Sequence, residues 1–149
     1  MRSCAHGYAS LGKAHMPITY EIDSTRNLIT YRASGMVTLK DAIDVIDRVV
    51  TSTNGDAMRL DVLFLLDPGA SVSQIDMDAI QQIKSRIETW VSKYPGAPIK
   101  CAIVSSPPED AVGELWRAMT DFDPALGEHT RIFRTASEAC AWLRPGRQE

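Results

Sequence analysis

The chain has few of the residues that support metal binding or nucleophilic catalysis. Its 149 residues include only three cysteines and three histidines. His6 and His15 fall in an unpatterned N-terminal stretch, and His129 stands alone. A zinc site needs cysteines and histidines at short, regular spacings, and a serine or cysteine nucleophile needs a nearby base. We therefore expect no metal, no cofactor and no catalytic residues, which predicts a protein that is not an enzyme.

Excess positive charge and long apolar runs are also missing. Sixteen Lys and Arg face nineteen Asp and Glu, so the net charge is −3. A duplex-binding protein needs a basic surface to displace counterions, so no nucleic-acid partner is expected. No apolar run approaches the roughly 20 residues that cross a bilayer, so no membrane span is expected.

An odd number of cysteines cannot all pair with one another. Cys101 and Cys140 fall in apolar segments, where a free cysteine behaves as a small hydrophobe. Unpaired cysteines are typical of a reducing compartment. The sequence therefore favours a cytoplasmic location.

Length and patterning predict one folded domain between two short tails. Residues 1–16 lack a hydrophobic period and the apolar region of a secretory signal, so we interpret them as a disordered leader or a cloning remnant. Patterned sequence occupies residues 17–144, and residues 145–149 form a polar tail. A domain of this size can bury roughly 68–70% of its unfolded surface, which is enough to fold without disulfides or metals.

Strand and helix patterns alternate along the first half of the domain. Ile18–Asp23 and residues 27–34 alternate around a short turn, which predicts an antiparallel hairpin. Thr38 and Asp41 have the spacing of a helix cap, and apolar residues at helical spacing continue to about residue 53. Residues 62–66 are continuously apolar, as expected of a parallel strand covered on both faces.

The second half continues this alternation. A helix is predicted from Met77 to about Tyr94, a strand over residues 98–105, a short strand over 130–134 and a last helix to Leu143. Ser106-Pro107-Pro108-Glu109 has the residues and spacing of a helix start. The predicted fold class is α/β, in the order ββαβαβαβα. It is a single five-stranded mixed sheet, with an antiparallel N-terminal hairpin plus parallel strands, and four helices.

Charged residues on the outer face of the first helix could suggest a cation site. Asp41, Asp44 and Asp47 are spaced by three, but Lys40 and Arg48 are interleaved with them. Such mixing of signs is typical of a solvated helix face, which is the interpretation that we favour.

The order of elements and the closing RIFRTASEACAWL sequence (residues 131–143) resemble the STAS superfamily, and within it the small SpoIIAA-like bacterial proteins. The resemblance extends from Pro17 to Leu143 and includes the ITYEID strand. It implies a SpoIIAA-like fold and a non-enzymatic regulatory or protein-interaction module with an unknown protein partner. Family members that antagonise anti-sigma factors have an Asp-Ser-Ser-Gly motif with a phosphorylatable serine. This chain has Ile75-Asp76-Met77-Asp78 near that position, so the usual switch is not expected.

Polar side chains gather where the carboxyl ends of the parallel strands are expected. Ligands of open α/β sheets commonly bind beyond that edge. We therefore predict that it contacts the protein partner or a ligand. The candidate contact residues are Asp67, Ser71, Ser73, Asp76, Asp78 and Ser105. Turn formation and helix capping are the alternative roles of the same residues.

Two other functions stay open. Met77, Trp90, Trp116, Met119 and Phe122 could line a pocket, which would make the protein a carrier or sensor of a small apolar or lipid-like ligand. SpoIIAA-like proteins are similar in topology to lipid-carrying CRAL-TRIO domains, although such apolar stripes more often pack on a sheet. A small enzyme of unknown reaction is the second alternative. The sequence is compatible with a homodimer and does not specify an oligomeric state.

Overall fold

The computed structural model describes residues 17–95, 99–106, 109–120 and 128–143. Its strands are β1 (Ile18–Asp23), β2 (Leu28–Ala33), β3 (Asp61–Leu66), β4 (Ile99–Val104) and β5 (Glu128–Phe133). Its helices are α1 (Leu39–Ser52), the short 3-10 helix η1 (Asp56–Arg59), α2 (Met77–Lys93), α3 (Asp110–Thr120) and α4 (Ala136–Leu143). The predicted α/β fold, with one five-stranded mixed sheet and four α-helices, is confirmed. The predicted leader and tail lie outside the described residues.

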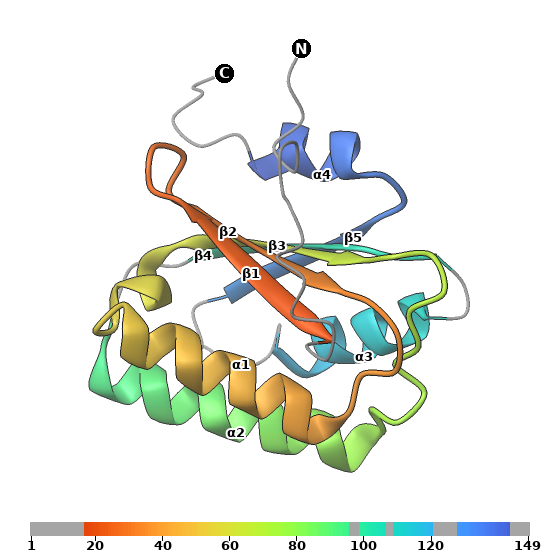
Figure 1. The fold of residues 1–149 in the computed structure, drawn as a ribbon, viewed down its shortest axis with the longest axis horizontal. Coiled ribbons are helices and arrows are strands. Elements are labelled where there is room, and N and C mark those ends of the chain that lie inside the picture. The colour runs from red at the N-terminus through yellow and green to blue at the C-terminus, as the bar shows by residue number, and fades with distance from the viewer. Residues whose placement is uncertain (1–16, 96–98, 107–108, 121–127, 144–149) are drawn as a thin grey trace.

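The strands stand in the sheet in the same order as in the sequence, β1-β2-β3-β4-β5. β1 is antiparallel to β2, and β2 to β5 are parallel. Each crossover moves the chain one strand further in the same direction, so successive crossover helices fall on the same face. α1, α2 and α3 accordingly cover one face of the sheet, and α4 covers the other (Figure 1). The central position predicted for residues 62–66 is confirmed, because β3 is the middle strand.

Local residues set the ends of α1. Thr38 Oγ1 accepts a hydrogen bond from the Asp41 N–H at 3.2 Å, and the Asp41 carboxylate accepts one from the Thr38 N–H at 2.9 Å. This reciprocal capping satisfies two N–H groups at the start of the helix, as the spacing predicts. Asn54 and Gly55, both at positive φ, follow the helix and turn the chain into η1. The sequence pattern did not predict η1.

The start of α3 differs from the prediction. The helix begins at Asp110 rather than at Pro107, and Glu109 lies in a turn before it. Pro107 and Pro108, two of the four residues of the predicted helix start, lie outside the described residues. Glu109 precedes the helix instead of being its third residue.

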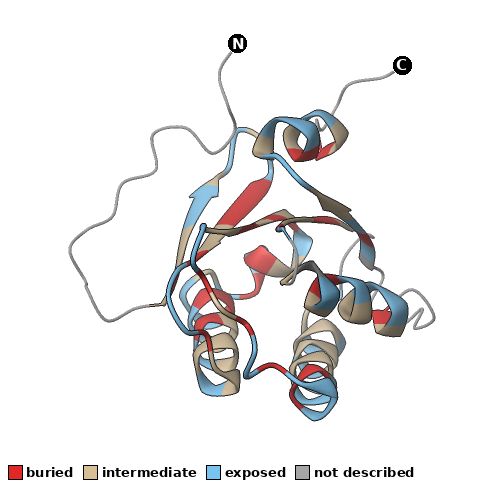
Figure 2. Ribbon diagram, turned by 90° about the vertical axis from the view of Figure 1, so that its right-hand side faces the viewer, coloured by how far each residue is buried: buried red, intermediate tan, exposed pale blue. Residues whose placement is uncertain are grey.

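The sheet has a tightly packed face and a looser one. On the α4 side, Leu63 and Ala102 are 0% exposed and pack with Ala139 and Leu143 of α4. Figure 2 shows the sheet between α4 and the other three helices. On the side of those helices, the β3 residues Val62, Phe64 and Leu66 are only half-buried. Residues 62–66 are therefore covered by helices on both faces, as predicted, but they are not fully buried on this side of the sheet.

The two cysteines of the described residues differ in state. Cys101 of β4 is a buried thiol outside any disulfide. Cys140 of α4 is disulfide-bonded, so the expectation that it is a free cysteine is wrong. The cytoplasmic location, which was inferred from unpaired cysteines, stays a prediction.

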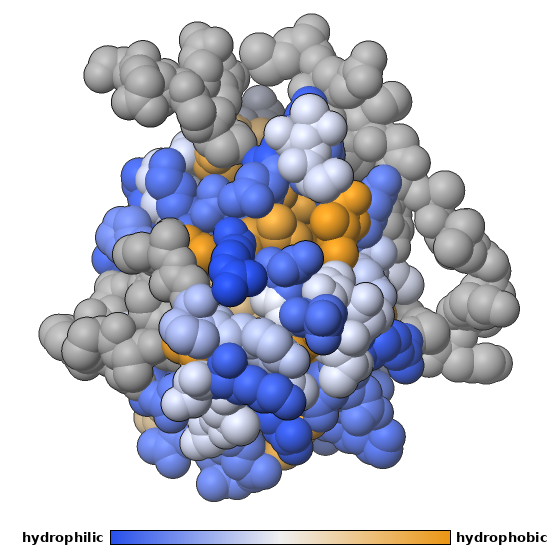
Figure 3. Space-filling view, turned by 90° about the vertical axis from the view of Figure 1, so that its left-hand side faces the viewer, coloured by the Kyte–Doolittle hydropathy of each residue, from blue (hydrophilic) through white to orange (hydrophobic). Residues whose placement is uncertain are grey.

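The outer surface is mostly polar on the side that Figure 3 shows, with a hydrophobic area in its upper half. The large hydrophobic residues that are exposed within the described ranges are Ile22, Met36 and Met77. None of the described helices is long and apolar enough to cross a membrane.

Candidate functional site

The predicted contact residues lie around a loop at the carboxyl edge of the sheet. Residues 67–76 connect β3 to α2 and run beside the segment that follows β2. The Val37 N–H donates to the Ser71 carbonyl at 2.9 Å, and the Ser71 N–H donates to the Gly35 carbonyl at 2.8 Å. Together with the bond from the Asp67 N–H to the Ala33 carbonyl at 2.9 Å, they attach the loop to the end of β2.

Within this loop, the predicted residues have local hydrogen bonds. Asp67 Oδ1 accepts a hydrogen bond from Arg32 Nη1 at 2.9 Å in a half-exposed ion pair. The hydroxyls of Ser71 and Ser73 are 3.0 Å apart and bond to each other. Asp67, Ser71 and Ser73 therefore shape the turn, in agreement with the alternative structural role.

The two acids at the start of α2 are also engaged. Asp76 is the N-cap of the helix, and its Oδ1 accepts a hydrogen bond from the Ala79 N–H at 2.9 Å. Asp78 accepts one from Gln82 Nε2, also at 2.9 Å. The carboxylates of Asp76 and Asp78 therefore already form hydrogen bonds within the first turns of α2.

Ser105 is separated from the others by burial. It is 3% exposed, and its carbonyl accepts a hydrogen bond from Arg134 Nη1 at 3.2 Å. Its Oγ is buried without a hydrogen-bond partner in the described part of the chain. Ser105 is therefore the least accessible of the predicted contact residues, and its role in contacting a partner or ligand stays a prediction.

The strand order also removes the usual reason for a crevice at this edge. In open α/β sheets, a crevice forms where neighbouring crossover helices lie on opposite faces. Here α1, α2 and α3 all lie on one face (Figure 1). The described strands thus provide no such switch point beside the predicted residues.

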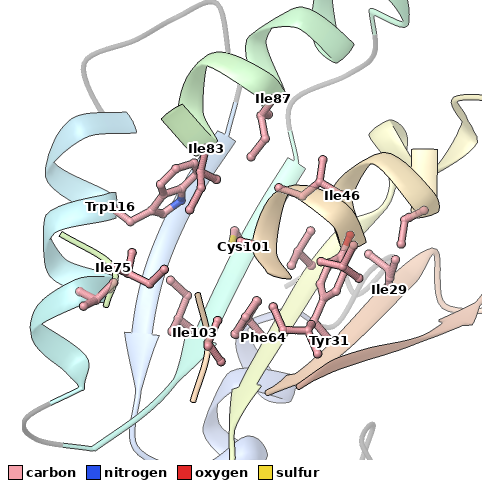
Figure 4. Close-up of a pocket in the computed structure, with 18 of the residues that line it drawn as sticks. Ile29, Tyr31, Ile46, Phe64, Ile75, Ile83, Ile87, Cys101, Ile103 and Trp116 are labelled. Carbon is pink, nitrogen blue, oxygen red and sulfur yellow. The ribbon is translucent and has the colours of Figure 1, made fainter. Parts of the chain in front are cut away.

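An apolar cavity of about 230 Å³ lies instead between the sheet and these three helices. Figure 4 shows Ile83 and Ile87 of α2 and Trp116 of α3 turned toward Cys101 and Phe64 of the sheet. The strand residues that line the cavity are Ile18, Ile29, Tyr31, Val62, Phe64, Leu66, Ile99, Cys101 and Ile103. The helix residues are Ala42, Val45, Ile46, Val49 and Val50 of α1, Ala57 and Met58 of η1, Ile80, Ile83 and Ile87 of α2, and Val112, Gly113 and Trp116 of α3.

The cavity exists because α2 packs on its neighbouring helices, chiefly α1, more than on the sheet. Trp90 Nε1 donates a hydrogen bond to Asp47 Oδ1 of α1 at 2.9 Å, and Arg86 Nη1 lies 3.3 Å from Asp47 Oδ2. The expectation of a solvated face is therefore wrong for Asp47, which joins two helices. Ile83 and Ile87 consequently stay half-buried above the sheet.

The C-terminal end of α2 is fixed by a close approach to the turn after α1. Gly55 has φ +89°, and a Cβ at this position would lie 2.2 Å from Cδ1 of the Tyr94 ring. Tyr94 also stacks on Trp90, with ring centroids 6.1 Å apart. Only glycine allows the Tyr94 ring to sit against this turn, so Gly55 helps to set the height of α2 above the sheet.

The polar groups of the cavity are few. Among the described residues that line it, Tyr31, Cys101 and Trp116 each have one polar group, and Glu109 is the only charged residue. A bound water needs two to four polar partners, whereas apolar cavities of comparable size stay dry and accept apolar guests. The chemistry of the lining therefore suits an apolar molecule.

The sequence pointed to other pocket residues. Of the five that it suggested, Trp116 lines the cavity, Met77 is 50% exposed, and Met119 packs against the core. Trp90 is held by Asp47, and Phe122 lies outside the described residues. The signal that was missed is the set of isoleucines on α2 and β4, whose spacing is also that of ordinary core residues.

No group of three His, Cys, Asp or Glu residues within the described ranges is arranged to hold a metal ion. Comparisons of the chain with protein-family models, with curated proteins and with solved structures gave no significant match. The structure establishes the α/β fold, and the resemblance to the STAS superfamily stays a prediction from the sequence.

Proposed function

We propose that this protein binds a small apolar or lipid-like molecule in the cavity between the sheet and α1, α2 and α3, as a non-enzymatic carrier or sensor. The observation that carries the proposal is the almost wholly apolar lining of a cavity of about 230 Å³. A cavity of about 150 Å³ lined by similar residues binds benzene. Benzene has six carbon atoms, so a volume of about 230 Å³ has room for about nine. It is smaller than the roughly 300–1,000 Å³ of sites for drug-sized ligands.

Filling the cavity would stabilise the fold. Side chains that border an unfilled space lose the dispersion contacts that a close-packed core would give them. Domains of this kind are stable by only about 5–15 kcal/mol. A ligand that restores the missing contacts should therefore have a measurable effect on unfolding.

Thermal unfolding with a series of 1-alkanols tests the proposal. A ligand at 100 times its Kd adds about 2.7 kcal/mol, which corresponds to a rise in Tm of about 5–10 °C. The rise should grow with chain length up to about nonanol and then stop, because the cavity is full. A series in which no alcohol raises the Tm would refute the proposal.

Regulation through a protein partner is a second candidate function, favoured by two exposed methionines. Met36, which forms a β-bridge with Ser71, and Met77, which begins α2, are each 50% exposed beside the loop of residues 67–76. Val72 and Ile75 of this loop line the cavity. A bound ligand would contact the loop from inside, so the same edge could report its presence.

Affinity capture with two lysine variants tests this second function. Met77→Lys should lose a partner that the wild-type protein retains. Ile22→Lys is the control and should still retain the partner. Ile22 is 36% exposed on β1 and pairs with Ile29, at the opposite end of the strands from the loop. Equal capture by both variants would contradict a partner site at the loop.

A further inference from the structure

Among the described residues that line the cavity, Glu109 alone is charged. On the basis of the proposed function, we propose that Glu109 selects ligands by the charge of their polar end. Molecules of about nine carbons with a neutral or cationic end, such as an alcohol or an amine, are accepted. Carboxylates of the same length are rejected.

Glu109 contributes to the wall of the cavity at the carboxyl edge of the sheet. It lies in the turn between β4 and α3, is half-buried, and is among the residues that line the cavity. None of the ion pairs formed between described residues includes it. A second carboxylate near it, beside apolar walls, would be repelled more strongly than in water, because the local dielectric is lower.

The starts of α1 and α2 at the same edge do not provide an alternative anion site. Free N–H groups at helix N-termini commonly hold carboxylates. Here Thr38 and Asp41 cap α1, and Asp76 caps α2, so acids of the chain already occupy that role. Asp76 and Asp78 also add negative charge to the edge.

The basic residues at this edge are already engaged by the chain itself. Arg32 pairs with Asp67 at 2.9 Å, and Arg134 donates to the Ser105 carbonyl at 3.2 Å. A ligand carboxylate would have to compete with these bonds. The described charges at the edge thus disfavour an anion and favour a cation near Glu109.

Calorimetric titration with three nine-carbon probes tests this selectivity at pH 7. The probes are 1-nonanol, nonylamine and nonanoate, and the variants are Glu109→Gln and Glu114→Gln. Glu114 is exposed on α3, where it pairs with Arg117 at 3.1 Å, so it controls for the loss of one charge. Burial costs an ammonium and a carboxylate alike, so the comparison of amine with carboxylate isolates the sign of the charge.

We expect the wild-type protein to bind nonylamine at least as tightly as 1-nonanol, and nonanoate at least about tenfold more weakly, a difference of about 1.4 kcal/mol. Glu109→Gln should reduce the gap between amine and carboxylate to within about threefold, and Glu114→Gln should leave it unchanged. Binding of nonanoate as tight as that of nonanol, or the same gap in Glu109→Gln, would overturn the selectivity while leaving the cavity proposal intact. Failure of all three probes to bind would instead overturn the proposed function, and the selectivity with it.

Discussion

The indole Nε1–H of Trp90 donates a hydrogen bond to Asp47 Oδ1 at 2.9 Å, and this contact joins α2 to α1 rather than to the sheet. The same carboxylate pairs with Arg86 at 3.3 Å. α2 can therefore stand above the sheet while its own position stays fixed. The cavity beneath it depends on this separation.

Replacing Asp47 should loosen α2. Asp47→Ala removes the acceptor of Trp90 and the partner of Arg86, so we expect a loss of about 1–2 kcal/mol in the free energy of unfolding. Hydrogen exchange should accelerate in α2 and remain unchanged in α4, which lies on the other face of the sheet (Figure 1).

Asp44→Ala is the matched control on the same helix. Asp44 raises the pKa of Lys40 through a hydrogen bond and through its charge, but Lys40 is fully exposed. Exposed pairs contribute little, so stability and exchange should hardly change. Equal effects of the two substitutions would show that Asp47 has no special role in holding α2.

Gly55 and Gly69 offer a comparison at nearly the same backbone angle. Their φ angles are +89° and +88°, but a Cβ would meet Tyr94 at Gly55 and nothing within 4 Å at Gly69. Both alanine variants should lose about 1–2 kcal/mol from the left-handed conformation, and Gly55→Ala should lose more. Urea unfolding measures both. If Tyr94→Ala does not reduce the difference between them, the ring contact is not its cause.

Cys101 and Ala102 are neighbours in β4 that face different environments. Cys101 lines the cavity, whereas Ala102 is 0% exposed against the α4 side. Cys101→Leu should fill empty space, leaving stability unchanged or up to about 1 kcal/mol higher. Ala102→Leu should overpack the other core and cost about 1–3 kcal/mol.

The same pair separates ligand binding from stability. Cys101→Leu should weaken the binding of 1-nonanol at least about tenfold, because the added carbons occupy the ligand's space. Denaturant unfolding and calorimetry measure the two quantities. A Cys101→Leu protein that loses stability as much as Ala102→Leu would mean that the space beside Cys101 is already filled.

Two buried threonines test the cost of an unmet hydrogen bond. Thr130 is 1% exposed, and its Oγ1 has no partner within the described ranges, whereas Thr120 is 2% exposed and donates to the Trp116 carbonyl at 3.0 Å. Thr130→Val removes a buried hydroxyl that bonds nothing, so it should be neutral or stabilising by about 1 kcal/mol. Thr120→Val should destabilise by about 1 kcal/mol. The reverse order in thermal unfolding would contradict this assignment of hydrogen bonds.

The sequence predicts the elements and their order because local signals were consistent. The Thr38–Asp41 cap, the turn at Asn54-Gly55 and the alternation in β1 each depend on residues close in the chain. The start of α3 was missed because Glu109 has the spacing of a capping box from Ser106, yet it lies in the turn before the helix. η1 was missed because a segment of four residues is too short to show a helical period in the sequence.

The cavity could not be predicted in the same way. The spacing of Ile80, Ile83 and Ile87 indicates which face of α2 is apolar, but it does not give the distance of that face from the sheet. That distance depends on Asp47, which comes from another helix, and on the close approach of Tyr94 to Gly55. Such contacts between distant residues have no periodic signature. The acidic residues at the strand ends can be recognised in the sequence, which is why the site was predicted at the edge of the sheet.

The most direct test of the central claim is a nuclear Overhauser experiment on protein labelled at its isoleucine methyl groups, with 1-nonanol added. Ile83 and Ile87 of α2 face Ile103 of β4 across the cavity (Figure 4). The account predicts that nonanol protons give cross-peaks to methyl groups on both the helix and the strand at once. Cross-peaks to the exposed Ile22 alone, or to no isoleucine, would contradict a ligand site between the sheet and its helices.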